Sequence, residues 1–146
     1  MSIIEVTSQN LEQFAKLSAM LFPEDDFNEL YDLYDKSLQT EKETGFLYEK
    51  DNKYVGMMHL SVRSDYVNGT NTSPVVFIEA IYVLDDYRKS GIGKEFIKYA
   101  ECCARQKGIT QVASDCLLDN NLSEQFHKGC GFEEKERTIC FVKDIV

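Results

Sequence analysis

The residues best suited to chemistry follow one another in a single segment. An apolar run, Val75 to Val83, leads through a short loop into the turn Arg88-Lys89-Ser90-Gly91-Ile92-Gly93 and then into a helical pattern. Glycines let neighbouring backbone N–H groups converge on an anion, and the start of a helix adds the positive end of its dipole. The turn contains neither GxxxxGK[ST] nor GxGxxG, so it is not one of the two common nucleotide-binding loops. The segment predicts a phosphate-binding turn, and a purely structural strand-to-helix connection is the alternative.

A carboxylate interrupts the apolar run at Glu79. An ionised group in such a strand is costly unless it is paired or has a function. A glutamate is suited to act as a general base, either directly or through one water molecule. Glu79 is therefore our candidate base, and an ion pair with Arg63 across the sheet is the alternative.

The elements that must position these residues are predicted from hydrophobic periodicity. Alternating patterns with periods of 2 and 3.6 residues predict an α/β fold, with a mixed central sheet flanked by helices on both faces. The most apolar strand, Val75 to Val83, is expected to be central. The other expected strands are residues 3–6, 45–50, 54–63 and 112–114, with two more after Gly131-Phe132. The expected helices run from about residue 8 to Pro23 and over residues 28–42, 92–108 and 122–128.

Length and composition limit the possible functions. We interpret the 146 residues as one domain, 1–146. The net charge of -9 argues against a nucleic-acid binder and suits a cationic ligand. No apolar run approaches the roughly 18 residues of a membrane span, and no signal peptide begins the chain, so we expect a cytoplasmic protein without membrane attachment. Five cysteines without a CxxC pair, together with two histidines, favour neither a metal site nor a covalent nucleophile.

The turn Arg88-Lys89-Ser90-Gly91-Ile92-Gly93 fits the Arg/Gln-x-x-Gly-x-Gly/Ala acetyl-CoA signature of the GNAT superfamily of N-acetyltransferases. The segment from Asn120 to Gly131-Phe132 resembles the Asn-helix-Gly-Phe ending of that family, and the order of elements agrees. Within the superfamily, residues 65–74, 77–79, 81–84, 113–115 and 118–120 are similar to the aminoglycoside 6'-N-acetyltransferases. The resemblance covers essentially the whole chain and implies the GNAT acyl-CoA N-acyltransferase fold.

The resemblance also implies a reaction and a donor site. An acetyl group would pass directly from acetyl-CoA to the 6'-amine of an aminoglycoside antibiotic in a ternary complex. Backbone groups of Ile81 and Val83 would hold the pantetheine arm, and an N–H there would polarise the thioester carbonyl. The other implied acetyl-CoA contacts are Tyr82, Arg88, Lys89, Ser90, Gly91, Ile92, Gly93, Lys94 and Asn120.

On the acceptor side, the resemblance implies that Tyr66, Asp115 and Glu136 contact the aminoglycoside, together with Glu79. For Asp115, a helix or turn cap is the alternative. Phe22 and Asp25 stand where the family has Trp and His. Phe22 keeps an aromatic surface without the indole donor, whereas Asp25 replaces a titratable base with a fixed anion.

His127 falls where many superfamily members have a tyrosine that protonates the leaving thiolate, and a surface or capping histidine is the alternative. A second interpretation of the whole site is acetylation of another cationic amine, such as a polyamine or a peptide amine. A third is binding of acyl-CoA or an aminoglycoside without turnover. We also expect a homodimer, because family members pair through their last strands and the apolar run Ile139-Cys140-Phe141-Val142 would otherwise leave a sheet edge exposed.

Overall fold

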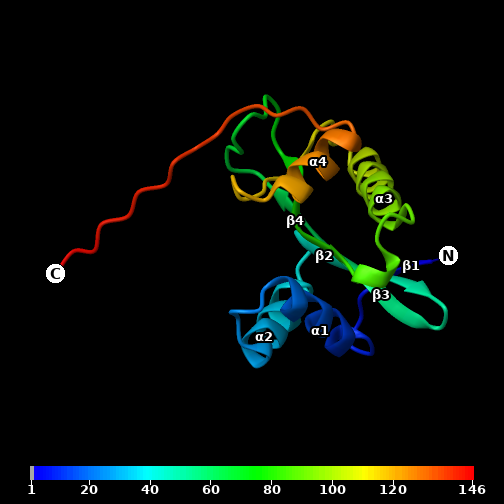
Figure 1. The fold of residues 1–146 in the computed structure, drawn as a ribbon. Helices are drawn as coiled ribbons and strands as arrows, with labels where there is room; N and C mark the ends of the chain where they lie inside the picture. Colours follow the sequence, from blue (N-terminus) through cyan, green and yellow to red (C-terminus); the bar gives the residue numbers. More distant parts are fainter. Residues whose placement is uncertain (1) are drawn as a thin grey trace. The chain divides into compact units, whose positions relative to one another are not determined.

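A computed structural model describes residues 2–146 and divides the chain into two compact units, Met1–Ser114 and Asp115–Val146. The first unit contains a five-stranded sheet with the order β1-β2-β3-β4-β5 (Figure 1). The first four strands pair antiparallel, and β5 runs parallel to β4, so the sheet is mixed as predicted. The strands are β1 (Ile3–Glu5), β2 (Glu43–Lys50), β3 (Lys53–Arg63), β4 (Val75–Val83) and β5 (Val112–Ala113).

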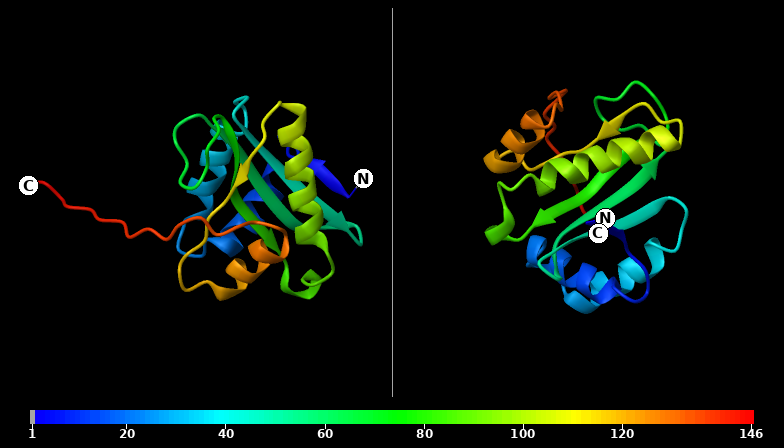
Figure 2. Two further views of the ribbon diagram at one scale, coloured as in Figure 1. Left: turned by 90° about the horizontal axis from the view of Figure 1, so that it is seen from above. Right: turned by 90° about the vertical axis from the view of Figure 1, so that its right-hand side faces the viewer.

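Helices cover both faces of this sheet, as the sequence predicts. Side chains alternate between the faces along β2. Leu47 belongs to the core formed with helices α1 (Leu11–Leu21) and α2 (Phe27–Ser37). Its neighbour Tyr48 instead packs edge-on against Phe96 of α3 (Ile92–Gln106), with ring centroids 5.8 Å apart. The right-hand view of Figure 2 shows α3 on one side of the sheet and α1 and α2 on the other.

Helix α1 forms where the sequence predicts it, with Leu11, Phe14 and Leu17 buried along one face. Helix α2 begins after Asp26, whose carboxylate accepts a hydrogen bond from the backbone N–H of Glu29 at 3.2 Å, satisfying one free donor of the first turn. The predicted end of α2 at residue 42 is wrong, because the helix stops at Ser37. By Glu43 the chain has already entered β2.

Strand β4 has the predicted bounds, Val75 to Val83, but the prediction that it is central is wrong. The middle strand is β3, and β4 lies between β3 and the two-residue β5. An apolar sequence indicates burial on two faces and does not determine the position of a strand in the sheet. Helix α3 is as predicted, with Ile92, Phe96, Ile97, Ala100 and Ala104 buried.

The second unit contains one helix, α4 (Asn121–Gly129). The side chain of Asn120 caps it by accepting a hydrogen bond from the backbone N–H of Ser123 at 3.1 Å. The two strands predicted after Gly131-Phe132 are absent, since residues 130–146 form no strand in the described chain. Phe141 is 88% exposed and Val142 92% exposed. An alternating apolar sequence forms a strand only beside a partner strand, and this segment has none here.

Within residues 2–146, no helix combines the length and the apolar composition needed to span a membrane.

Candidate active site

A β-bulge places Glu79 in the sheet. In the pairing of β3 with β4, His59 lies opposite Ala80 and Leu60 lies opposite Ile78, so Glu79 is an extra residue on β4. A bulge of this kind bends the strand and re-aims the side chain at the extra position. Ala80 packs in the core formed with α1 and α2. Ser61 and Arg63, two residues apart on β3, project from the face of the sheet that packs against this core. Glu79 contacts both side chains, so it lies on the same face as Ala80.

The carboxylate of Glu79 accepts three hydrogen bonds from β3. Ser61 donates from Oγ to Oε2 at 2.5 Å, Arg63 donates from Nε to Oε2 at 2.9 Å, and Arg63 Nη2 donates to Oε1 at 2.8 Å. The ion pair with Arg63, given above as the alternative interpretation of Glu79, is therefore present. Burial acts to raise the pKa of Glu79, but the hydrogen bonds from Arg63 and Ser61 outweigh it and hold this pKa below its ordinary value. Glu79 is an ionised group at neutral pH.

Beyond the bulge, one edge of β4 has no strand partner. Strand β5 pairs with β4 only at Val76 and Phe77. Among residues 2–146, no strand pairs with this edge between Ile78 and Val83. Backbone groups on such an edge are able to bind an extended ligand as an added strand would bind.

The register shows which backbone groups this edge presents. Leu84 donates its N–H to the carbonyl of Val55 on β3 at 2.9 Å. Because residues alternate in the direction of their backbone groups, Tyr82 also directs its groups toward β3. Ile81 and Val83 then direct their N–H and C=O groups to the unpaired edge, where the resemblance requires them.

Arg88 contacts the end of β4 and the loop that follows it. Its Nε donates to the carbonyl of Val83 at 2.8 Å, its Nη1 lies 2.5 Å from Oδ1 of Asp85, and its guanidinium lies 5.3 Å from the ring centre of Tyr82. Arg88 therefore stabilises the connection between β4 and α3. Lys89 and Lys94 are both exposed beside the start of α3.

The turn before α3 has the backbone conformation of an anion-binding site. Lys89 and Gly91 have φ angles of +62° and +90°, on either side of Ser90. Alternation of left-handed and right-handed residues points successive N–H groups into one concavity. The first turn of α3 adds N–H groups that have no intrahelical acceptor, since the bond from Glu95 to the Gly91 carbonyl at 3.0 Å begins the helical series. A Cβ at Gly91 would meet no atom within 4 Å, so the turn is open to a ligand.

Apart from Glu79, the candidate acceptor residues of the first unit lie in two loops. Phe22 ends α1, and its carbonyl accepts a hydrogen bond from the N–H of Asp25 at 3.1 Å. Burial raises the pKa of the nearby Tyr34, and the charge of Asp25 raises it further. Tyr66 lies in the loop between β3 and β4 with 74% of its surface exposed, and its hydroxyl accepts a bond from Gly69 N–H at 3.4 Å. The two aromatic candidates are thus accessible to a ligand.

The remaining predicted residues belong to the second unit. Asp115 and Glu136 are exposed, and Asn120 is the cap of α4. His127 lies on α4, and its Nδ1 donates to the carbonyl of Ser123 at 2.7 Å, which fixes the orientation of the ring. Asn120 therefore has a structural role as a helix cap, and His127 has a structural contact within α4, as the alternative interpretation of His127 proposes.

Sequence reasoning missed Ser61, and it missed the pairing of buried His59 with Glu43, whose Oε1 lies 2.7 Å from His59 Nε2. The available signal was a row of polar residues at alternate positions of an otherwise apolar strand, His59, Ser61 and Arg63. Such a row indicates a polar strip on one face of the sheet.

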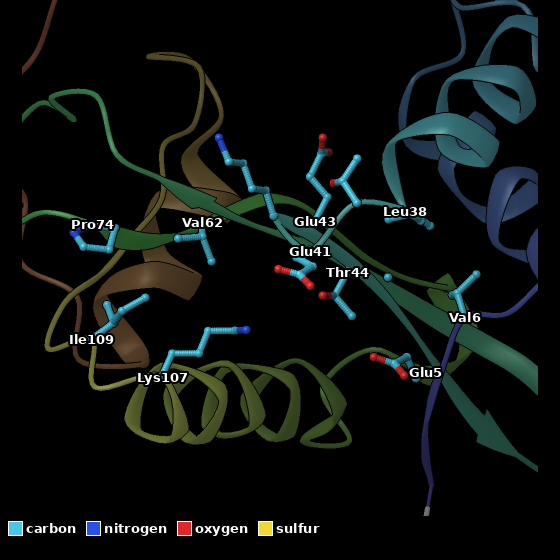
Figure 3. A pocket seen from close by; sticks show the side chains of 13 residues that line it. Glu5, Val6, Leu38, Glu41, Glu43, Thr44, Val62, Pro74, Lys107 and Ile109 are labelled. Carbon is cyan, nitrogen blue, oxygen red and sulfur yellow. The ribbon is translucent and has the colours of Figure 1, made fainter.

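A cavity of about 670 Å³ lies elsewhere in the first unit and contains none of the predicted site residues. Figure 3 shows the side chains of Glu5, Glu41 and Lys107 around it, together with the apolar Val62 and Ile109. It has no convergent pair of groups comparable to Glu79 and Arg63, so we place the candidate active site at β4 and not in this cavity. Among residues 2–146, no three His, Cys, Asp or Glu side chains are grouped to hold a metal ion.

These features agree with known proteins. The model of the acetyltransferase (GNAT) family matches residues 11–132, and the chain therefore belongs to this family. An aminoglycoside N(6')-acetyltransferase type 1 from Acinetobacter genomosp. 13 is 37% identical over 145 residues, covering 99% of each chain. The GNAT fold predicted from the resemblance is confirmed.

Two solved structures show how far the similarity extends. The apo structure of an aminoglycoside 6'-N-acetyltransferase from Acinetobacter haemolyticus has a TM-score of 0.94 and 35% identity, covering 100% of both chains. The structure of AAC(6')-Iy in complex with the bisubstrate analogue CoA-S-monomethyl-acetylneamine has a TM-score of 0.93 and 33% identity, covering 98% of this chain and 97% of that one.

Proposed function

We propose that this protein transfers an acetyl group from acetyl-CoA to the 6'-amine of an aminoglycoside by direct transfer in a ternary complex. The observation that carries the proposal is the position of Glu79, at a bulge where the unpaired edge of β4 begins. A carboxylate is thereby held beside the backbone groups that would receive the acetyl donor. The relatives described above act on aminoglycosides or bind a CoA analogue, which supports the same choice of substrates.

The donor side fits the chemistry of acetyl-CoA. The pantetheine arm contains amide groups, which complement the edge-facing N–H and C=O groups of Ile81 and the N–H of Val83, and Tyr82 lies between these two residues. The carbonyl of Val83 already accepts a hydrogen bond from Arg88. Acetyl-CoA supplies the acetyl group as a thioester, whose carbonyl a backbone N–H on this edge would polarise. The pyrophosphate would meet the N–H groups from Lys89 to Lys94 at the start of α3. We propose further contacts from Arg88 and Asn120.

Glu79 would act on the acceptor amine. An amine is mostly protonated at pH 7 and must lose a proton before its lone pair can attack. The ionised carboxylate of Glu79 attracts the ammonium group and accepts its proton through one water molecule. Because the pKa of Glu79 lies below its ordinary value, the carboxylate is unprotonated at neutral pH and available to accept that proton.

The other proposed roles follow the resemblance. Tyr66 and Phe22 would offer aromatic surfaces to the sugar rings, and Asp25, Asp115 and Glu136 would bind ammonium groups. His127 would protonate the departing thiolate. Since a free thiol has a pKa near 8.5, its thiolate leaves tolerably well, and we expect this contribution to be small.

We also propose a homodimer formed through the run Ile139-Cys140-Phe141-Val142. This segment is exposed and forms no strand in the described chain, so its apolar side chains lack a covering partner. Acetylation removes the positive charge of the 6'-ammonium and so weakens the attraction of the drug for an anionic target, which makes antibiotic resistance the expected outcome. Because acetyl-CoA is a cytoplasmic metabolite, we place the reaction in the cytoplasm.

A panel of amines tests the proposed substrate. Purified protein with acetyl-CoA should release CoA thiol on addition of an aminoglycoside with a 6'-amine, and much more slowly with a polyamine or a basic peptide. Faster release of CoA thiol with the polyamine or the peptide would show that this amine, and not the aminoglycoside, is the preferred substrate. Binding without release for every amine would indicate a non-catalytic binding protein.

A further inference from the structure

One side chain directly before β5 holds the surface loop that carries Tyr66. Oε1 of Gln111 accepts three hydrogen bonds from this loop, from the N–H of Asn71 at 2.9 Å, from the N–H of Thr72 at 3.1 Å and from Oγ1 of Thr72 at 2.9 Å. Because two of these partners are backbone N–H groups, the oxygen of the Gln111 amide, and not its nitrogen, must face the loop. The backbone of Gln111 is itself fixed in the sheet, since its carbonyl accepts the N–H of Val76 on β4 at 3.1 Å.

The same loop has a second anchor nearer its start. We name residues 64–74, which join β3 to β4, the acceptor loop. Val67 of this loop is buried in a small apolar cluster with Val75 and Phe77 of β4. The acceptor loop is therefore fixed at two points, by an apolar contact at Val67 and by the three hydrogen bonds at residues 71–72.

The position of Tyr66 depends on these two anchors. Tyr66 lies next to Val67 and is 74% exposed. Its hydroxyl accepts the N–H of Gly69, a residue of the same loop, at 3.4 Å. A contact of this kind orients the ring relative to the loop and not relative to the sheet. The place at which Tyr66 meets a ligand therefore follows the acceptor loop.

Gln111 supplies the polar anchor, and its loss should affect the order of the loop more than the stability of the fold. Asn71 and Thr72 are exposed. Their N–H groups can therefore bond to water when the Gln111 oxygen is removed, and no buried donor is left unpaired. A loop released in this way samples several conformations, and a ligand that needs one of them binds more weakly because binding must order the loop.

We propose that Gln111 is a positioning residue for the acceptor, which fixes the acceptor loop so that the ring of Tyr66 is already in place when an aminoglycoside binds. This inference rests on the proposed function and on the role proposed there for Tyr66. Acetyl-CoA would bind at the edge of β4 and at the turn before α3, and neither includes the acceptor loop. Loss of the Gln111 anchor should therefore weaken binding of the acceptor and not of the donor.

The test uses the fact that all three hydrogen bonds end on the oxygen of Gln111. Gln111→Met keeps the length of the side chain but removes this oxygen, and the Kd for kanamycin should rise at least fivefold while the Kd for acetyl-CoA stays within twofold of wild type. Gln111→Glu keeps an acceptor oxygen for the same three donors and should bind kanamycin no more than twofold more weakly than wild type. Thr72→Val removes one of the three bonds from the other side and should raise the Kd for kanamycin by at least twofold.

Binding and turnover are measured separately. Calorimetry gives the Kd for kanamycin with CoA present, since CoA has no acetyl group to transfer. The Kd for acetyl-CoA is measured without an amine, and release of CoA thiol is followed in a third experiment.

A double-mutant cycle separates this role from a general structural one. Tyr66→Ala alone should weaken binding of kanamycin. In the Tyr66→Ala background, Gln111→Met should change the Kd for kanamycin less than twofold, because the ring that Gln111 positions is gone. Gln106→Met is a matched control, since it makes the same replacement at an exposed position at the end of α3, and it should leave both Kd values unchanged.

Each outcome bears on the inference. A Kd for kanamycin within twofold of wild type in Gln111→Met would overturn it, as would an equal loss of affinity for acetyl-CoA or an equal effect with and without Tyr66. Gln111→Glu binding as weakly as Gln111→Met would also overturn it. Thr72→Val decides if Gln111→Met does not fold, and an unchanged Kd in Thr72→Val would then overturn the inference.

The proposed function fails in a different way. A wild-type protein that binds no kanamycin would overturn both the proposed substrate and the role of Gln111. The expected pattern of Kd values without any release of CoA thiol would support the role of Gln111 and refute only the proposed reaction.

Discussion

Arg63 and Glu79 form a two-bond ion pair, from Nε to Oε2 at 2.9 Å and from Nη2 to Oε1 at 2.8 Å. Burial alone would favour the neutral form of Glu79, and the pair reverses that preference. Glu79 continues the alternation of Val75 and Phe77, which pair with Arg63 and Ser61, so its side chain projects from the same face of the sheet as theirs. The carboxylate that attracts a cationic acceptor is therefore charged before the acceptor arrives.

The lowered pKa of Glu79 predicts how stability depends on pH. A carboxyl whose pKa is lower in the folded state stabilises that state above its unfolded pKa, about 4.5 here, and the stabilisation is lost as the pH falls through the folded value. The difference in free energy of unfolding between wild type and Glu79→Gln should be constant from about pH 8 to 5.5. It should shrink below about pH 4.5, where His59 and the pair with Arg63 no longer face a charged carboxylate. Urea unfolding at several pH values measures this, and a difference that grows on acidification would contradict the assignment.

Glu79→Gln also tests the role of the carboxylate in the reaction. The amide keeps the size of the side chain and its contact with Ser61 but cannot accept a proton. We expect kcat to fall about 100-fold or more, with little change in the KM for acetyl-CoA. Steady-state CoA release measures both constants. A loss of less than threefold would show that Glu79 is not the base.

Gly91→Ala tests the anion-binding turn. At a φ of +90°, any side chain strains the backbone by about 1 to 2 kcal/mol, and we expect this strain to shift the N–H groups that would bind the phosphate. The KM for acetyl-CoA should rise about tenfold or more. Gly108→Ala is a matched control, since Gly108 has a φ of +70° and a Cβ added there would meet no atom within 4 Å, but it lies beyond the other end of α3. Both variants should lose similar stability, and an equal rise in KM would refute a phosphate site at Gly91.

The exposed apolar run predicts the assembly state. Phe141→Asp places a charge in the centre of the proposed interface and should convert a dimer of 16.8 kDa chains into monomers. Ile145→Asp is the control, because Ile145 is 95% exposed but lies outside the run. Light scattering during gel filtration measures the mass. A monomeric wild type, or a dimeric Phe141→Asp, would remove the proposed interface.

Much of the fold was predictable because local periodicity determines it. The buried residues of α3 recur every three or four positions, and Pro23 marks the region where α1 must end. The end of α2 was not predictable in this way, since no glycine or proline occurs between Asn28 and Gly45. The pairing of Glu43 with Ser61 decides it, and that contact joins residues 18 positions apart.

The candidate site was predictable in its residue types and less so in its geometry. An ion pair with Arg63 was inferred as an alternative, because a charge in an apolar strand requires a partner. The bulge depends on how β3 and β4 align, which the sequence of β4 alone does not reveal. The prediction of two last strands was wrong for a related reason: a strand requires a neighbouring strand as well as a suitable sequence.

Acetylation of the 6'-amine is the central claim, and two aminoglycosides that differ only at the 6' position test it most directly. One carries a 6'-amine and the other a 6'-hydroxyl, and each is mixed with acetyl-CoA and the purified protein. We expect rapid release of CoA thiol with the first compound only, and a product whose NMR spectrum shows the acetyl group on the 6'-nitrogen. No release with the 6'-amine compound, or equal release with both compounds, would contradict the claim.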